Sequence, residues 1–346
     1  MKLIILLLAA AIGASTALDC VQIPDSSIYV GHSVSIPTGA TQPVDLPPNF
    51  NCTYQIKSPS MVYAHVRLEN QLKGGNDMIT VRDAMGKRTL VASRSAAILN
   101  FYVFPGTTTT IQVVTKSVDV GSKFRMTVFY AQMPNPTISQ IGSDLKYFYL
   151  NDLQANAMKT PQNVVSNQQV VLTTAPSQAS YDDFDNYFII DGTLSTNKGV
   201  YHLSDYLHRN FVSSANNLTV VGLDNLVSAS TIILSNIADT RQFFDFTAVT
   251  ADTSVHTVTV NGVDKREGMT VIAAKNSNTV TFTGFKLLDN SRDPQCSVKA
   301  YSSPMTENSP VLLDFTTVNS FPYTLNQKYF IVVVQSCSAQ FTFYSQ

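Results

Sequence analysis

Apolar and polar residues alternate along most of the chain with the period of two that is typical of β-strands. Cys52, Tyr54 and Ile56 fall on one face of such a segment, and the polar residues between them fall on the other. The same alternation returns in Val62–Leu68 and in Phe124–Tyr130, and turn-forming residues separate these segments. No long stretch has helical periodicity. The pattern predicts an all-β fold of tandem antiparallel β-sandwiches with a jelly-roll character.

Domain boundaries follow from proline and from a weak internal repeat. Two prolines in Met133–Pro136 cannot donate ladder hydrogen bonds, so we expect a linker at 132–137 between a first domain at 18–131 and a second sandwich at 138–240. Asn76–Asp83 and Phe184–Asp191 share the spacing of two aspartates around an apolar run. This match favours two sandwiches of the same type, with coincidence as the alternative.

The last third of the chain, 241–346, is predicted to be a further β-rich domain or a continuation of the second. Its apolar runs suit strands, and Asn261–Gly262 has the composition of a hairpin turn. The pattern changes at Tyr201–His208, where a short helix would bring His202 and Asp205 to one face. An ordinary surface turn of helix is the favoured interpretation of that segment.

The first seventeen residues have the features of a secretory signal peptide. Lys2 precedes an apolar run at Leu3–Ile12, and small residues such as Ser15 and Ala17 follow it. An uncleaved anchor is the alternative, but this run is much shorter than the roughly 20 residues that span a bilayer. We therefore expect a secreted, extracellular protein that begins near Leu18 and has no integral membrane segment.

Four cysteines suit an oxidising compartment. They lie at the two ends of the predicted mature chain, at Cys20, Cys52, Cys296 and Cys337. Three pairings are compatible with four cysteines, and their clustering favours Cys20 with Cys52 and Cys296 with Cys337. A zinc site is the alternative, but neither a CxxC motif nor a histidine pair accompanies these thiols.

Charge and surface motifs narrow the range of partners. The 23 Lys and Arg residues nearly balance the 24 Asp and Glu residues, so the basic surplus that nucleic-acid binding requires is missing. Two sequons, Asn51-Cys52-Thr53 and Asn217-Leu218-Thr219, predict N-glycosylation at Asn51 and Asn217.

Residues 19–131 resemble a CUB domain, in particular the diverged CUB-like family of secreted nematode proteins. The resemblance rests on Pro47–Ile56, Gly75–Asp83, and Val113–Ser117 followed by Phe124–Tyr130, in the family's order and spacing. It implies a jelly-roll-like sandwich used for extracellular recognition, with Cys20 and Cys52 at the position of the family's first disulfide. It also implies intestinal secretion and a role in responses to infection. The family's usual second disulfide is absent.

Many CUB domains bind calcium through one glutamate and two aspartates, and the resemblance makes Glu69, Asp77 and Asp119 the matching candidates. Ca²⁺ requires six to eight oxygen ligands, which carboxylates on two converging loops provide. Asp119 lies one residue later than the family pattern because Val118 intervenes. Three ordinary loop acids are the alternative.

A second candidate site combines acids with aromatic rings. Its members are Tyr181, Asp182, Asp183, Asp185 and Tyr187. Two carboxylates can serve as acid and base on a glycoside, but adjacent aspartates in a polar loop are more often solvated turn residues. A sugar-binding platform is the better version of this hypothesis.

Motifs of the common enzyme classes are missing from the sequence. It contains no G-x-S-x-G, no H-E-x-x-H and no phosphate-binding glycine loop, and its five histidines are scattered. We therefore expect a non-enzymatic recognition glycoprotein that acts in innate defence at an epithelial surface, with an extracellular protein or glycan as ligand. The alternatives are a lectin-like or glycan-active protein that uses residues 181–187, and a structural protein of the extracellular matrix.

Overall fold

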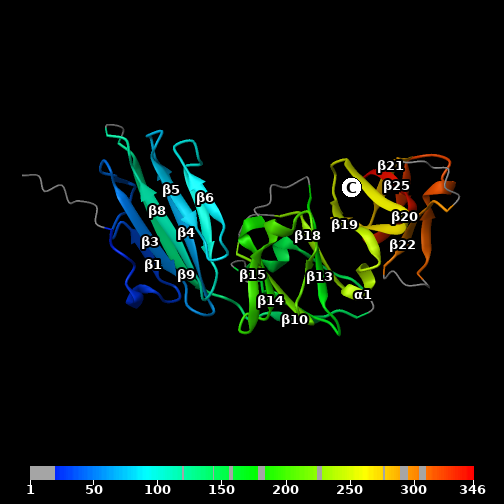
Figure 1. Ribbon diagram of the computed structural model, residues 1–346, viewed down its shortest axis with the longest axis horizontal. Helices are drawn as coiled ribbons and strands as arrows, with labels where there is room; N and C mark the ends of the chain where they lie inside the picture. Colours follow the sequence, from blue (N-terminus) through cyan, green and yellow to red (C-terminus); the bar gives the residue numbers. More distant parts are fainter. Residues whose placement is uncertain are drawn as a thin grey trace, which may run out of the picture. The chain divides into compact units, whose positions relative to one another are not determined.

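A computed structural model describes residues 20–118, 121–142, 144–155, 159–177, 184–223, 228–275, 277–288, 295–303 and 309–346, without the side chains of 263–265. The chain forms two compact units that divide between Met133 and Pro134, inside the segment predicted to be a linker. Both units consist mostly of β-strands in antiparallel sheets, which confirms the predicted fold class (Figure 1). The predicted signal peptide at 1–17 lies outside the described residues.

The N-terminal unit is a sandwich of two antiparallel sheets. One has the order β1-β9-β4-β7 with β2 attached to β9, and the other has the order β3-β8-β5-β6. Its strands are β1 (Ser33–Ile36), β2 (Val44–Asp45), β3 (Asn51–Lys57), β4 (Val62–Gln71), β5 (Met78–Arg82), β6 (Arg88–Val91), β7 (Ile98–Val103), β8 (Thr108–Val114) and β9 (Lys123–Gln132).

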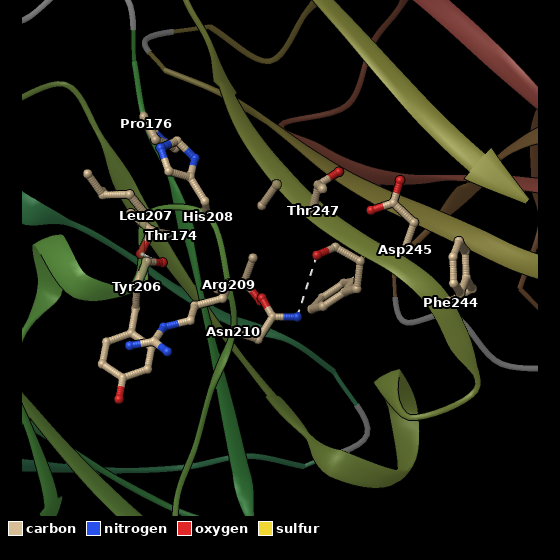
Figure 2. Close-up of a pocket in the computed structure, with 13 residues that line it drawn as sticks. Thr174, Pro176, Tyr206, Leu207, His208, Arg209, Asn210, Phe244, Asp245 and Thr247 are labelled. Carbon is tan, nitrogen blue, oxygen red and sulfur yellow. Dashed lines mark hydrogen bonds between the residues drawn. The ribbon is translucent and has the colours of Figure 1, made fainter. Parts of the chain in front are cut away.

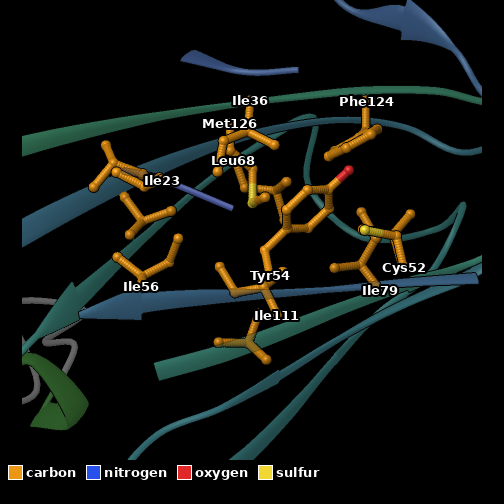
Figure 3. Close-up of a cluster of buried hydrophobic side chains, with 14 of the residues drawn as sticks. Ile23, Ile36, Cys52, Tyr54, Ile56, Leu68, Ile79, Ile111, Phe124 and Met126 are labelled. Atoms are coloured by element: carbon orange, nitrogen blue, oxygen red, sulfur yellow. The ribbon is translucent and has the colours of Figure 1, made fainter. Parts of the chain in front are cut away.

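Alternation along these strands fills the core between the two sheets. Residues of β3 are alternately exposed and buried, so Cys52, Tyr54 and Ile56 point inward as predicted. Figure 3 shows the Tyr54 ring among apolar side chains of both sheets, including Phe124 from β9 and Ile111 from β8. A disulfide joins Cys20 to Cys52 and attaches the segment before β1 to this core.

The first part of the C-terminal unit repeats the strand order of the N-terminal sandwich. Its sheets have the orders β11-β18-β13-β16 and β12-β17-β14-β15, which match β1-β9-β4-β7 and β3-β8-β5-β6 strand for strand. An additional strand, β10, pairs in parallel with β12. The strands are β10 (Thr137–Gln140), β11 (Lys146–Tyr149), β12 (Gln162–Val165), β13 (Val170–Ala175), β14 (Tyr187–Gly192), β15 (Asn197–His202), β16 (Phe211–Val212), β17 (Asn217–Gly222) and β18 (Thr231–Asn236). Short helical turns are η2 (Leu150–Leu153), η4 (Phe184–Asn186) and η5 (Leu203–Tyr206).

Strand β18 is buried on both of its faces. Ile232 and Leu234 pack into the core of the repeated sandwich, whereas Ile233 between them packs against Met269 and Ile331 of the following sheet. A strand covered on both sides needs consecutive apolar residues instead of alternating ones. The run Ile232-Ile233-Leu234 therefore joins the repeated sandwich to the end of the chain in one unit.

The end of the chain forms a seven-stranded sheet. Its main path is β19-β20-β25-β21-β24, and β22 connects β23 to β25. The strands are β19 (Phe243–Ala251), β20 (His256–Ala274), β21 (Val280–Leu287), β22 (Ser297–Ser302), β23 (Val311–Asp314), β24 (Tyr323–Leu325) and β25 (Tyr329–Tyr344), with the turns α1 (Ile237–Thr240) and η6 (Phe315–Thr317). A second disulfide joins Cys296 to Cys337 within this region, so both pairings agree with the sequence expectation.

The hairpin predicted at Asn261–Gly262 is wrong. Strand β20 runs through both residues, and Gly262 pairs with Cys337 of β25 beside a shift in register. A Cβ atom at Gly262 would lie 2.2 Å from the carbonyl oxygen of Val334. The glycine therefore permits a close approach of two backbones at a bulge and does not form a turn.

Candidate functional site

The Asp77 carboxylate connects two loops of the N-terminal sandwich through hydrogen bonds. Its Oδ1 accepts hydrogen bonds from the backbone N–H groups of Lys116 at 2.8 Å and Ser117 at 3.0 Å, and its Oδ2 accepts one from the Ser122 hydroxyl at 2.6 Å. Burial acts to raise the pKa of Asp77, but the hydrogen bonds from Ser122, Lys116 and Ser117 outweigh it and lower the pKa below its usual value. The carboxylate thus already has three protein donors.

Glu69, the second calcium candidate, is engaged elsewhere. Its carboxylate lies 3.1 Å from the guanidinium of Arg125, which also donates to the carbonyl oxygen of Ala40. Asp119 lies outside the described residues. Within the described ranges, the structure contains no group of three His, Cys, Asp or Glu side chains that could hold a metal ion. The calcium site and its alternative, three ordinary loop acids, both stay predictions.

The acidic and aromatic candidate is only partly described, because Tyr181, Asp182 and Asp183 fall in the gap between 177 and 184. Asp185 lies on η4, and its backbone carbonyl accepts a hydrogen bond from His202 Nδ1 at 2.6 Å. The expectation that Tyr187 presents its ring to a ligand is wrong. Tyr187 is 1% exposed and belongs to the core, because its place at the start of β14 turns its side chain inward.

The predicted glycosylation residues both lie on strands. Asn51 is exposed at the start of β3, on the face opposite Cys52. Asn217 is half-buried at the start of β17 and pairs with Val165.

A serine, an aspartate and a histidine meet where β13, β19 and β20 come together. The Ser177 hydroxyl donates to Asp252 Oδ2, and His256 Nε2 lies 3.0 Å from Asp252 Oδ1. Nucleophilic catalysis requires the serine to contact the imidazole and the carboxylate to orient that ring from behind. Here both groups contact the carboxylate, so this buried trio has the contacts of a structural network.

A groove beside β19 has a volume of about 520 Å³. We call it the β19 groove. One wall is β19 from Phe244 to Ala248. The other wall runs from Tyr206, the last residue of η5, to Asn210, and Thr173 and Thr174 of β13 also line the groove (Figure 2). Ligand pockets commonly have volumes of roughly 300–1,000 Å³, so the β19 groove is large enough for a ligand.

Basic and aromatic groups gather on the wall that follows η5. The Arg209 guanidinium carbon lies 4.6 Å from the centre of the Tyr206 ring, and its Nε donates to the Asp205 carbonyl oxygen. Asn210 spans the groove, since its Oδ1 accepts from the Thr173 hydroxyl and its Nδ2 donates to the Phe246 carbonyl oxygen at 3.5 Å. His208 and Arg209 are exposed. The wall therefore offers charge, hydrogen bonds and an aromatic surface together.

The facing wall has one carboxylate, which already has partners, and a guanidinium at its end. Asp245 Oδ2 accepts hydrogen bonds from the backbone N–H of Asn261 at 3.1 Å and from its Nδ2 at 3.2 Å. Phe244 is 53% exposed, and the Arg266 guanidinium lies over its ring. The groove thus combines an aromatic end, where Phe244 contacts Arg266, with a basic wall at Arg209.

Part of this site was visible in the sequence. The change of pattern at Tyr201–His208 marks the segment, which forms the turn η5 and not a longer helix. His202 is buried and bonds to Asp185, so it does not share an open face with Asp205. The contribution of β19 had no local signal, because its position at the edge of the sheet depends on the topology of the whole unit.

The two packed sheets and the Cys20–Cys52 disulfide define the N-terminal unit as an all-β sandwich. Residues 16–134 match the family model of the CUB-like domain, so this unit is a CUB-like domain. No curated protein matches the chain. No helix in the described part has the length and apolar character needed to span a bilayer.

The solved structures that match the chain have low sequence identity and low TM-scores. The CUB1-EGF-CUB2 domains of rat MASP-1 are 10% identical, with 94% of this chain and 99% of that chain covered and a TM-score of 0.24. The corresponding human MASP-1/3 structure is 8% identical, covers 91% and 98%, and has a TM-score of 0.23. The extracellular region of zebrafish Gpr126/Adgrg6 is 9% identical, covers 91% and 51%, and has a TM-score of 0.25.

Proposed function

We propose that this protein is a non-enzymatic, extracellular recognition glycoprotein that captures a ligand in the β19 groove. The observation that carries this proposal is the groove itself, with a volume of about 520 Å³ and exposed His208 and Arg209 on one wall. Two disulfides support an oxidising compartment. The contacts of Ser177, Asp252 and His256 support a structural role for the one triad-like group described above.

The biological setting that we propose is innate defence at an epithelial surface. The CUB-like domain at residues 16–134 supports it, because the resemblance to secreted nematode proteins of this family implies a response to infection. In this proposal the ligand is a component of a microbial or host surface, and the C-terminal unit holds the walls of the groove in place.

The test is capture of intact bacteria and of epithelial extracellular proteins by the full chain, secreted from cultured cells. We expect the double variant His208→Ala/Arg209→Ala to lose at least about tenfold in capture, because it removes the charged wall of the groove. Lys198→Ala is the matched control, since Lys198 is exposed on β15 of the same unit and does not line the groove. Equal capture by the double variant and by the control would refute the proposal.

A further inference from the structure

One edge of β19 has no strand partner. β19 pairs in parallel with β20 on one side, and no other described strand pairs with it. Edge strands with free N–H and C=O groups are templates for pairing with another chain. The outer edge of β19 borders the β19 groove, so a ligand in the groove meets these backbone groups directly.

Two hydrogen bonds establish which residues of β19 point outward. In a parallel strand, successive residues direct both of their backbone groups to alternate sides. The Ala251 carbonyl accepts from Lys275 N–H at the end of β20 and therefore faces β20, whereas the Phe246 carbonyl accepts from Asn210 across the groove. Phe246 and Ala248 thus face outward, while Thr250 on the same edge is fully buried.

The open part of the edge therefore presents the N–H and C=O groups of Phe246 and Ala248. These four groups have the spacing with which one β-strand pairs with another. In the described structure, only one of these four groups has a hydrogen-bond partner. The Phe246 carbonyl accepts from Asn210 Nδ2 at 3.5 Å, which is at the long limit for such a bond. An added strand would satisfy the remaining groups and replace or share that contact.

The positive charge of Arg209 on the opposite wall indicates that such a strand carries acidic side chains. In the described structure Arg209 has no carboxylate partner, and its Nε donates to a backbone carbonyl. The carboxylate of Asp245, on the other wall, is bound by Asn261. A free guanidinium pairs best with a carboxylate, which it can contact through two N–H groups.

We propose that the outer edge of β19 receives an extended, acidic peptide segment as an added β-strand, with backbone hydrogen bonds to Phe246 and Ala248 and a carboxylate paired with Arg209. This inference rests on the proposed recognition function and specifies the chemistry of its partner. Strand addition obtains affinity from main-chain hydrogen bonds and specificity from contacts of alternate side chains. The Phe244 ring, which is 53% exposed although the Arg266 guanidinium lies over it, provides a contact for an apolar residue of the peptide.

The test measures binding of fluorescein-labelled octapeptides to the full chain by anisotropy. The first set of probes is an acidic array, in which glutamate or aspartate alternates with valine, threonine or phenylalanine. The second set has lysine in place of the acids. The third set consists of acidic peptides that are N-methylated at alternate residues. We expect the acidic array to contain binders. We expect the lysine and N-methylated versions to bind at least about tenfold more weakly, because they lose the ion pair or the strand hydrogen bonds.

Substitutions at Ala248 and Arg209 test where the peptide binds. Ala248→Pro removes the outward N–H without removing a bond to β20, and Ala248→Ser is its matched control. Arg209→Ala should weaken acidic peptides about five- to tenfold, and Arg209→Lys should restore part of that loss because it keeps the charge. Thermal melting establishes that each variant is folded. If Ala248→Pro fails to fold, the N-methylated peptides still test for strand pairing.

The outcomes separate this inference from the proposed function. An array without binders, or equal binding of N-methylated and unmodified peptides, overturns strand addition. If His208→Ala/Arg209→Ala still reduces bacterial capture in that case, the recognition function stands, and a glycan becomes the occupant of the groove. If no groove variant changes peptide binding or the capture of bacteria, both proposals fail together.

Discussion

His256 Nε2 lies 3.0 Å from Oδ1 of Asp252, and both side chains are almost completely buried. The same carboxylate accepts hydrogen bonds from the Ser177 hydroxyl and from the Ser254 N–H at 2.8 Å. Asp252 therefore connects the loop after β13 to the turn between β19 and β20. This network fixes the end of the strand that forms one wall of the β19 groove.

The first prediction concerns the stability of this network at acidic pH. Burial acts to raise the pKa of Asp252, but the hydrogen bonds from Ser177, Ser254 and His256 outweigh it and lower the pKa to about 2. A folded-state pKa below the unfolded value stabilises the protein above pH 4, and this contribution is lost as the pH falls toward 2. We expect Asp252→Asn to lower the free energy of unfolding by about 2 kcal/mol at pH 7.

Urea denaturation at pH 7, 4 and 2.5 measures this contribution. The difference between the parent and Asp252→Asn should shrink steadily below pH 4. Asp239→Asn is the control, since Asp239 is exposed in the same unit. A difference that stays constant between pH 7 and 2.5 would show that folding does not lower the pKa of Asp252.

The sequence predicted features that depend on local pattern. The alternation of Cys52, Tyr54 and Ile56 determines which face of β3 is buried, because successive residues of any strand point to opposite sides. The position of Cys20 near this strand in sequence made its pairing with Cys52 the favoured one. Both features therefore needed no knowledge of the strand order.

Features that depend on topology could not be predicted. Asn261–Gly262 has the composition of a turn, but its glycine serves the close approach of β20 to β25, which lies far away in sequence. Tyr187 follows acidic residues that indicate a surface loop, yet it is the first residue of a buried strand. The open edge of β19 exists because β20 pairs with β25 on its other side, a relationship between strands that no local pattern encodes.

A second prediction concerns the buried hydroxyl of Tyr54. Its Oη has no hydrogen-bond partner among the described residues, and burial raises the pKa of this side chain to about 12. A buried polar group without a partner costs stability, so Tyr54→Phe should raise the free energy of unfolding by about 1 kcal/mol. Thermal and urea denaturation measure this change. A loss of more than about 1 kcal/mol would instead reveal a buried partner such as water.

A third prediction concerns glycosylation of Asn51. Its side chain is exposed on the face of β3 opposite Cys52, so a glycan there points to solvent and leaves the core intact. We expect protein secreted from insect cells to lose one glycan mass in Asn51→Gln, with an unchanged melting temperature. Intact-mass analysis before and after enzymatic deglycosylation measures this. Asn217→Gln is the matched control, because Asn217 lies in the second sequon. A mass that changes only in Asn217→Gln contradicts the prediction.

The last prediction concerns calcium. Asp77 is 2% exposed and accepts hydrogen bonds from Lys116, Ser117 and Ser122, while Glu69 is paired with Arg125. Ca²⁺ binding would have to compete with these donors for the same carboxylates. We therefore expect the loop to be stable without metal, and millimolar CaCl₂ to shift the melting temperature of the parent by less than about 1 °C.

Substitution of Asp77 distinguishes a carboxylate that only accepts hydrogen bonds from one that binds calcium. Asp77→Asn should lower the free energy of unfolding by about 1–3 kcal/mol, by the same amount in EDTA and in calcium, because it weakens three hydrogen bonds to a buried carboxylate. Asp83→Asn, directly after the other end of β5, controls for the loss of charge on a carboxylate that also accepts a backbone hydrogen bond, from Lys87 at 2.9 Å. If calcium stabilises the parent and Asp83→Asn but not Asp77→Asn, Asp77 is a ligand and its three donors must rearrange when the ion binds.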